Sequence, residues 1–265
     1  MPFTMSHAAA VLPFYRPLAR WRVLSAALIG SMVPDFHIFA PWRMERFETH
    51  SAVALFTFSL PVGLVCYWVF QYLIKVPMIE VLPDAAFARW RPFAAPAPIE
   101  SLRQWLIAAC GVLTGAVTHL VWDAFTHEGA RGVRMLPIQD EPFFDVGHHH
   151  LLFTRVLQDV SSLVGLVIVI AVLGYALRSD RQEPAVSRML SAAERHAWVW
   201  ALTLGSCVLW AAFLALSYLD GGIPRVGWLV YEAAIASLRG FASAAILFAV
   251  LLQWRLRVLA ARAAT

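Results

Sequence analysis

Charged residues are scarce in this 265-residue sequence. Asp, Glu, Lys and Arg together make up 14% of it, and Lys75 is the only lysine. Hydrophobic residues account for 60%, and the mean hydropathy is +0.66. Soluble domains contain about one quarter charged residues, so this composition excludes an ordinary soluble globular protein. It predicts a membrane protein with several spans.

Cysteine is also rare, because the chain has only Cys66, Cys110 and Cys207. Each lies in an apolar run without a CxxC or other ligand spacing, so we interpret them as small lipid- or core-facing residues and no disulfide framework is implied. The net charge of +4 comes from arginines that stand singly in loops. No basic stripe is interleaved with aromatic residues, so we expect membrane lipids as partners and no nucleic acid. The oligomeric state is left open.

Five apolar stretches are long enough to cross a hydrocarbon layer of about 30 Å. They cover residues 51–74, 104–126, 157–177, 197–219 and 226–254. Residues 21–33 are too short to cross, so a re-entrant or interfacial pair of short helices is expected there. The proline-rich residues 75–103 predict a loop of low regularity. The predicted fold is an all-α, polytopic helical bundle in one integral-membrane domain, with residues 1–50 as the re-entrant segment and 51–265 as the bundle.

The loops differ in their content of Lys and Arg, which predicts the orientation in a bacterial inner membrane. The tail after Trp254 contains Arg255, Arg257 and Arg262 and no acidic residue, which places the C-terminus in the cytoplasm. Counting back along the five spans then puts residues 34–50, 127–155 and 220–225 outside. The polar ends of the first three spans consequently meet at one extracytoplasmic interface.

A polar stripe runs through the end of the second predicted span. His119, Asp123 and His127 lie at i, i+4 and i+8, so they share one face of a helix. An imidazole and a carboxylate one turn apart can hydrogen-bond each other or bind one cation. Ionisable residues in hydrocarbon are expensive unless they are paired, hydrated or bound to an ion, and this favours a functional site.

Three further residues supply donors of the same kind. Asp35 follows Pro34, His50 stands where the first span begins, and His7 lies near the N-terminus. Together with the helical stripe they form a set of nitrogen and oxygen donors suited to zinc, manganese or iron(II). The run of residues 148–150 is also histidine, which is more typical of a solvated loop.

Several of these residues lie in motifs that resemble a known family. The opening MPFTMSHAAA, the later SAALIGSMVPDF, the THS at 49–51 and the HLVWD at 119–123 are similar to those of bacterial membrane proteins of the domain-of-unknown-function 4184 family. More distantly, the PD, THS and HxxxD elements resemble predicted membrane-bound metal-dependent hydrolases and zinc-dependent phospholipase C. The late HxxxE of the phospholipase has no counterpart. The resemblance implies the following metal ligands: His7, Asp35, His50, His119 and Asp123, with His127 as a further candidate.

The resemblance also implies an activity, the hydrolysis of a lipid-linked or membrane-proximal phosphoester by metal-activated water. A divalent metal is the expected cofactor, zinc first and manganese or iron as alternatives. The catalytic candidates are Asp123, Glu128 and Asp159. Arg131 and Arg134 could contact an anionic head group.

Two other functions remain open. Glu232 and Arg239, within the fifth span, could form a polar relay with His119 and Asp123 in a transporter. Alternatively, the protein is a membrane scaffold whose polar residues have only a structural role.

Overall fold

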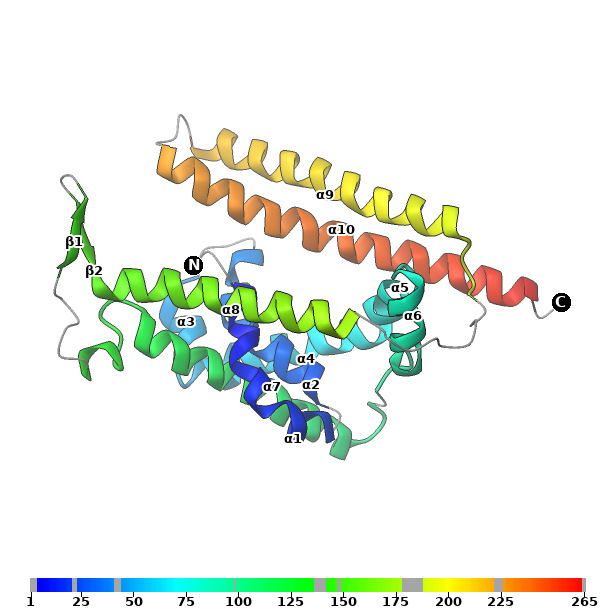
Figure 1. Cartoon of the computed structure of the whole chain (residues 1–265), viewed down its shortest axis with the longest axis horizontal. Helices are drawn as coiled ribbons and strands as arrows, with labels where there is room; N and C mark the ends of the chain where they lie inside the picture. The colour runs from blue at the N-terminus through cyan, green and yellow to red at the C-terminus, as the bar shows by residue number, and fades with distance from the viewer. Residues whose placement is uncertain are drawn as a thin grey trace. The chain divides into compact units, whose positions relative to one another are not determined.

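The structure, a computed structural model, describes residues 4–20, 23–40, 44–97, 99–135, 142–146, 149–177, 188–221 and 226–263. Helices dominate these ranges (Figure 1). The only strand pairing within them is a two-stranded antiparallel sheet of β1 (Pro142–Val146) and β2 (His149–Leu152). The prediction of an all-α fold is therefore confirmed.

Five helical stretches are long and apolar enough to cross a membrane, as the sequence predicts. They are Leu55–Glu80, Leu102–Thr126, Phe153–Ala176, Ala192–Leu219 and Tyr231–Arg262. The last four belong to α7 (Leu102–Thr126), α8 (Phe153–Leu177), α9 (Ala192–Gly221) and α10 (Val226–Ala263). The first is a composite of α4 (Leu60–Val69) and α5 (Lys75–Glu80) with two π-helical turns, η3 (Leu55–Ser59) and η4 (Phe70–Ile74).

The prediction of an irregular loop at residues 75–103 is wrong for its first half. The first apolar helix continues to Glu80, and α6 (Asp84–Trp90) and the 3-10 turn η5 (Arg91–Phe93) follow. Pro77 lies within α5, and two other prolines stand at helix starts, Pro83 as the N-cap of α6 and Pro92 in the first turn of η5. Proline lacks an N–H that these positions do not need, so it starts helices here instead of breaking them.

The N-terminal segment is a series of short helices. It comprises the 3-10 helix η1 (Thr4–Phe14), α1 (Tyr15–Arg20), α2 (Leu24–Gly30), the 3-10 helix η2 (Val33–Phe39) and α3 (Arg46–His50). The expected helix at residues 21–33 is shorter than predicted, because α2 ends at Gly30 and Pro34 stands in the first turn of η2.

The chain forms two compact units. Unit 1 comprises residues 1–67 and 98–175, and unit 2 comprises residues 68–97 and 176–265. In unit 2, α9 packs along α10, and Leu190, Phe248, Leu252 and Leu256 form its buried core. The guanidinium of Arg188 lies 3.8 Å from the centre of the Phe87 ring and 3.1 Å from Asp84 Oδ1.

Glycines bring α2 and α7 into close contact in unit 1. A Cβ atom at Gly115 would overlap the carbonyl oxygen of Ala27, and one at Gly30 would overlap that of Val112. Small residues allow two helix backbones to approach in this way. The contact fixes η2, which follows α2, beside the half of α7 that contains His119.

Candidate metal centre

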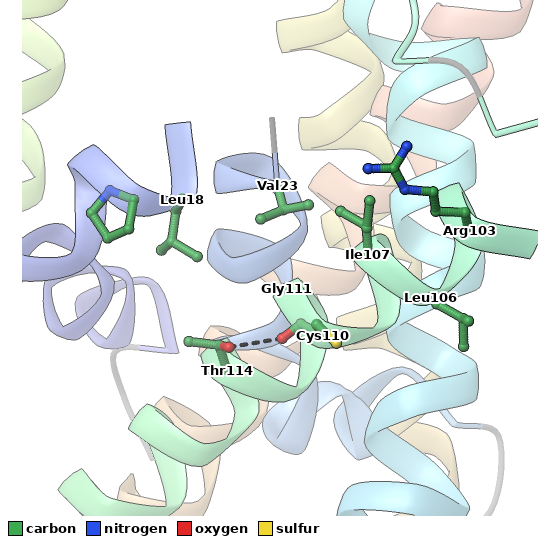
Figure 2. A pocket seen from close by; sticks show the side chains of 9 residues that line it. Leu18, Val23, Arg103, Leu106, Ile107, Cys110, Gly111 and Thr114 are labelled. Atoms are coloured by element: carbon green, nitrogen blue, oxygen red, sulfur yellow. Dashed lines mark hydrogen bonds between the residues drawn. The ribbon is translucent and has the colours of Figure 1, made fainter. Parts of the chain in front are cut away.

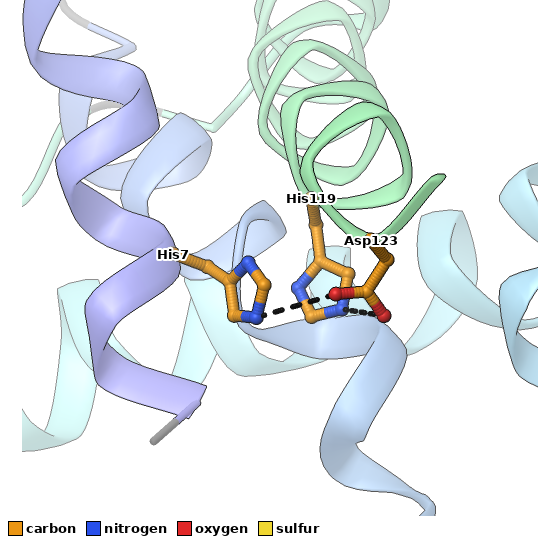
Figure 3. Close-up of side chains that lie close together, drawn as sticks. All are labelled: His7, His119 and Asp123. Carbon is orange, nitrogen blue, oxygen red and sulfur yellow. Dashed lines mark ion pairs between the residues drawn. The ribbon is translucent and has the colours of Figure 1, made fainter. Parts of the chain in front are cut away.

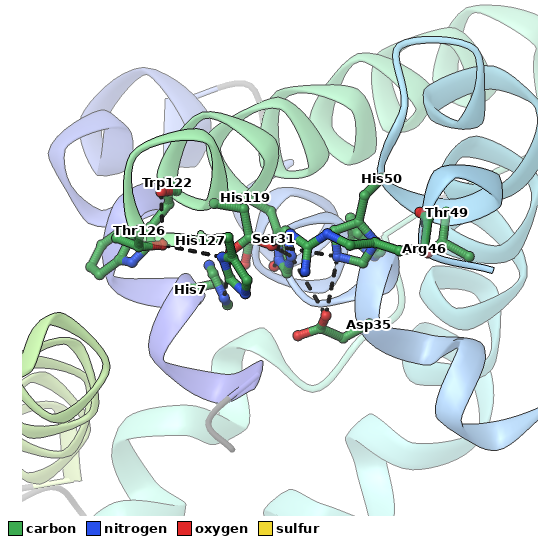
Figure 4. A network of polar contacts seen from close by, with 12 residues as sticks. His7, Ser31, Asp35, Arg46, Thr49, His50, His119, Trp122, Thr126 and His127 are labelled. Carbon is green, nitrogen blue, oxygen red and sulfur yellow. Dashed lines mark hydrogen bonds and ion pairs between the residues drawn. The ribbon is translucent and has the colours of Figure 1, made fainter. Parts of the chain in front are cut away.

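Six side chains from four parts of unit 1 meet in one polar cluster, which we call the His/Asp cluster (Figure 4). The cluster comprises His7 from η1, Asp35 from η2, His50 from α3, His119 and Asp123 from α7, and His127, the C-cap residue of α7. These are the six residues that the sequence predicts as metal ligands. The exposed fractions of His119, Asp35 and Asp123 are 0%, 1% and 3%, so the centre of the cluster is inaccessible to bulk water.

Four residues form the centre of the cluster. His50 Nε2 lies 3.3 Å from Asp35 Oδ1 and 3.5 Å from Asp123 Oδ2. His119 Nε2 lies 3.7 Å from Asp35 Oδ1 and 3.6 Å from Asp123 Oδ2. Good N–H···O hydrogen bonds are shorter, about 2.7–3.2 Å. The Nε2 atoms of His50 and His119 and both oxygens of Asp35 are buried without a hydrogen-bond partner among the described residues.

These separations fit the edges of a tetrahedral metal site. Two donors about 2.0–2.1 Å from a zinc ion in tetrahedral geometry lie about 3.4 Å apart, close to the four distances between the imidazole nitrogens and the carboxylate oxygens. Two imidazoles and two carboxylates are also a donor set that zinc, manganese and iron(II) accept. Asp35, His50 and His119 can each direct one donor atom at a common point, with these atoms within 4.8 Å of one another.

Hydrogen bonds at the far nitrogens orient the two central imidazoles. His119 Nδ1 lies 2.7 Å from the carbonyl oxygen of Ser31, which can only accept, so Nδ1 carries the proton and donates. His50 Nδ1 lies 2.7 Å from the hydroxyl of Thr49, which is itself 3.4 Å from the carbonyl oxygen of Arg46. Such bonds leave the Nε2 lone pairs free to bind a metal and fix the ring orientation.

The two oxygens of Asp123 face different partners. Oδ2 faces His50 and His119, whereas Oδ1 lies 3.7 Å from His7 Nε2 and 3.3 Å from His127 Nδ1. Figure 3 shows the rings of His7 and His119 side by side, each facing a different oxygen of this carboxylate, and the rings stack with centroids 3.8 Å apart. Asp123 is therefore shared between a central group of donors and an outer one.

His127 differs from the other imidazoles of the cluster. Its Nε2 lies 3.1 Å from the Nε2 amide of Gln158, which can only donate. His127 Nε2 is then the acceptor, and its Nδ1 proton points at Asp123 Oδ1. This arrangement favours a role for His127 in holding Asp123 over a role as a direct ligand.

Burial shifts the pKa values of several groups in the cluster. Burial, reinforced by the charge that His119 carries when protonated, lowers the pKa of His7 to about 4. Burial also lowers the pKa of His50 and that of His127. Burial alone would raise the pKa of Asp35, but the contact with His50 and the positive charges that His119 and His7 carry when protonated hold that pKa far below its usual range. Imidazoles bind metal ions in the neutral form and carboxylates in the ionised form.

Arg46 also contacts the cluster, although the sequence does not predict it as a site residue. Its Nη2 donates a hydrogen bond of 2.8 Å to Asp123 Oδ2. The spacing of Arg46 and His50, four residues apart on α3, puts both side chains on one helix face and could have indicated this role. Arg46 and Asp123 are 77 residues apart in the sequence, so spacing along the chain does not indicate their contact.

The two other catalytic candidates lie on exposed surface. Asp159 is paired with Arg155 at 3.3 Å, and its side chain is 50% exposed. Glu128 is exposed as well. Neither side chain has a described hydrogen bond or ion pair with the His/Asp cluster, although Glu128 directly follows His127 in the chain. His148 lies outside the described residues, and of His149 and His150 only the backbone in β2 is described.

An apolar pocket of about 320 Å³ lies elsewhere in unit 1 (Figure 2). Leu18, Val23, Leu106 and Ile107 contribute to its wall, and Arg103 stands at its edge. The only hydrogen bond drawn there joins the Thr114 hydroxyl to the carbonyl oxygen of Cys110, one turn earlier on the same helix. Arg103 is the one charged residue of this lining and Cys110 supplies its one thiol, so the pocket assembles neither a set of metal ligands nor an acid-base pair.

Comparison with known proteins gives a family and no annotated relative. No curated protein and no solved structure matches the chain. The model of one family, described as a domain of unknown function (DUF4184), matches residues 1–253. Because the match covers nearly the whole chain, including every residue of the His/Asp cluster, the protein belongs to the DUF4184 family.

Proposed function

We propose that this protein is a metal-dependent membrane hydrolase that cleaves a lipid-linked or membrane-proximal phosphoester. The ligands are Asp35, His50, His119 and Asp123. His7, which faces the other oxygen of Asp123, is a further candidate ligand. The cation is a divalent metal, zinc first and manganese or iron(II) as alternatives. The similarity of the PD, THS and HxxxD motifs to predicted metal-dependent hydrolases and to zinc-dependent phospholipase C supports the same reading.

The observation that carries the proposal is the environment of Asp35. This carboxylate is 1% exposed, and neither of its oxygens has a hydrogen-bond donor among the described residues. An isolated buried carboxylate is strongly unfavourable, and the pKa of this one is lowered only through the imidazoles of His50, His119 and His7, so its charge depends on a cationic group beside it. The two nitrogens that face it, on His50 and His119, are themselves buried and unpartnered. A cation held between such groups satisfies all of them at once.

The chemistry available to such a site is hydrolysis. A divalent cation supplies Lewis acidity, which lowers the pKa of water from 15.7 to about 7 and polarises a phosphoryl oxygen. His119 and His50 fix their Nε2 atoms through Ser31 and Thr49, and His127 holds the outer oxygen of Asp123. The chain thus keeps the donors in place before any ligand arrives. The inferred location is the extracytoplasmic interface of the inner membrane, with the C-terminus in the cytoplasm.

The contact distances also admit a structural alternative. A protonated imidazole could neutralise Asp35 and Asp123 in a network of ion pairs, because each of the four central separations is below 4.0 Å. Such a network would make the cluster a support for the helices, as in a scaffold. The transporter alternative involves Glu232 and Arg239, which lie on α10 in unit 2.

Turnover measurements on the full chain in detergent would test the proposal. Metal-depleted protein would receive zinc, manganese or iron(II), with a fluorogenic phosphodiester lipid in mixed micelles as substrate. We expect metal-dependent hydrolysis that Asp35→Asn lowers roughly a hundredfold or more. Asp159→Asn is the matched control, since it alters an exposed carboxylate. It should retain metal binding and metal-dependent hydrolysis. Hydrolysis that survives metal removal, or no hydrolysis with any of the three metals, would argue for the structural network.

A further inference from the structure

We propose that Arg46 is the anion-binding residue of the His/Asp cluster, so that the substrate presents an anionic oxygen group, such as phosphate, next to Asp123. This inference rests on the proposed function and specifies the substrate class of the same site. It replaces Arg131 and Arg134, the arginines that the sequence suggests for an anionic group, with a residue whose position the structure defines.

The side chain of Arg46 is far more exposed than the other side chains of this contact network. The side chain of Arg46 is 46% exposed, whereas those of Asp35, His50, His119 and Asp123 are between 0% and 4% exposed. His7 and His127 reach 8% and 15%. Arg46 is therefore the member of this contact network that reaches solvent most, and a ligand arriving from solvent meets its guanidinium first.

Arg46 and His50 contact the same carboxylate oxygen from one helix. They stand four residues apart on α3, and both side chains reach Asp123 Oδ2. The distances are 2.8 Å for Arg46 Nη2 and 3.5 Å for His50 Nε2. One nitrogen of the guanidinium thus contacts the donor set, while the side chain of Arg46 stays 46% exposed.

The guanidinium of Arg46 has more hydrogen-bond donors than its contact with Asp123 uses. A guanidinium has five N–H donors and no acceptor, and the contact with Asp123 is the one hydrogen bond of this side chain that the structure describes. The remaining donors form the planar fork that recognises phosphate or carboxylate oxygens in pairs. A metal ion bound to Asp123 Oδ2 would also weaken the hydrogen bond between that oxygen and Arg46. The guanidinium would then be more available to an anion.

Arg134 provides a matched control. Its side chain is also exposed and also uses one hydrogen bond, from Nε to the carbonyl oxygen of Gly129. Unlike Arg46, it has no described contact with the His/Asp cluster. A general effect of removing an arginine would appear in both variants, and an effect of the site would appear only at Arg46.

The experiment measures the binding of two probes, zinc alone and inorganic phosphate, to the full chain in detergent. Wild type, Arg46→Ala, Arg46→Lys and Arg134→Ala would be compared with one equivalent of zinc and after metal depletion. We expect Arg46→Ala to weaken phosphate binding to the zinc-loaded protein about tenfold or more, Arg46→Lys to weaken it less, and Arg134→Ala to leave it unchanged. Zinc affinity should be equal or higher in Arg46→Ala, because a competing cation is removed from Asp123.

Two results would overturn the inference. Phosphate affinity that is the same in Arg46→Ala and wild type would exclude a role in anion binding. Zinc affinity that falls as far as phosphate affinity would show that Arg46 only positions Asp123. If the wild type takes up no zinc, the proposed function fails separately, and the comparison of phosphate binding by the metal-free variants then decides the role of Arg46.

Discussion

At the scale of single residues, Thr49 is expected to set the metal affinity through His50. Its hydroxyl lies 2.7 Å from His50 Nδ1 and is completely buried. Thr49→Val keeps the shape but removes the group that orients the imidazole, so zinc affinity should fall about 10- to 100-fold. Competition with a chelator in detergent measures this affinity. Thr49→Ser keeps the hydroxyl and should bind zinc nearly as well as wild type. Equal affinities in the Val and Ser variants would refute the role of Thr49.

The sequence predicts six residues of the cluster and misses Arg46. The helical period links His119, Asp123 and His127, and family motifs mark His7, Asp35 and His50. The structure brings all six together. Arg46 is missed because its partner Asp123 is 77 residues away and no pattern in α3 indicates a contact with α7. Chain periodicity predicts neighbours on one helix, whereas contacts between helices depend on packing.

At the scale of elements, the glycine contact between α2 and α7 explains why the site can form. The sequence predicts α7 well because its apolar run is long, and its N-terminus has a capping box of Ser101 and Gln104. The short helices at the N-terminus are harder to predict, since residues of η1 and η2 owe their conformation to packing against α7. The prediction for residues 75–103 fails because proline content indicates irregular chain in general, yet prolines such as Pro83 and Pro92 also begin helices.

Gly115→Ala should loosen the scaffold of the site. The added methyl group would overlap the backbone of Ala27, and forced separation of well-packed elements typically costs about 1–3 kcal/mol. We expect a lower melting temperature and weaker zinc binding. The fluorescence of the 11 tryptophans reports the melting temperature.

Gly174→Ala on α8 is the control for this variant. A Cβ atom at Gly174 has no neighbour within 4 Å in the described structure, and alanine favours a helix by about 1 kcal/mol over glycine. Its melting temperature should equal or exceed that of wild type. If both alanine variants melt alike, close packing of α2 on α7 is not what stabilises unit 1.

At the scale of the whole molecule, composition predicts the membrane class, and the five apolar helices agree with it. The boundaries shift by a few residues, because helices extend into flanking polar segments that hydropathy alone does not capture. Orientation rests on a different property, the distribution of arginines among the loops, which contact geometry within the chain does not report. It therefore needs a measurement on intact membranes.

Cysteine labelling would measure the orientation. In a background with Cys66, Cys110 and Cys207 replaced by Ser, Arg134→Cys should react with a membrane-impermeant maleimide added outside the inner membrane. Arg257→Cys should react only after the membrane is permeabilised, because the arginine-rich tail is expected in the cytoplasm. Both positions are exposed in the structure. The opposite labelling pattern would place the His/Asp cluster at the cytoplasmic interface.

The central claim is that buried His and Asp side chains hold a metal ion, and the metal-to-protein ratio tests it most directly. Elemental analysis of the full chain, purified in detergent after equilibration with zinc, would compare wild type with Asp123→Asn and Asp159→Asn. The account predicts about one or more metal ions per chain in wild type and in Asp159→Asn, and loss of most of the metal in a still helical Asp123→Asn. Wild-type protein free of metal, or Asp123→Asn with the wild-type ratio, would contradict it.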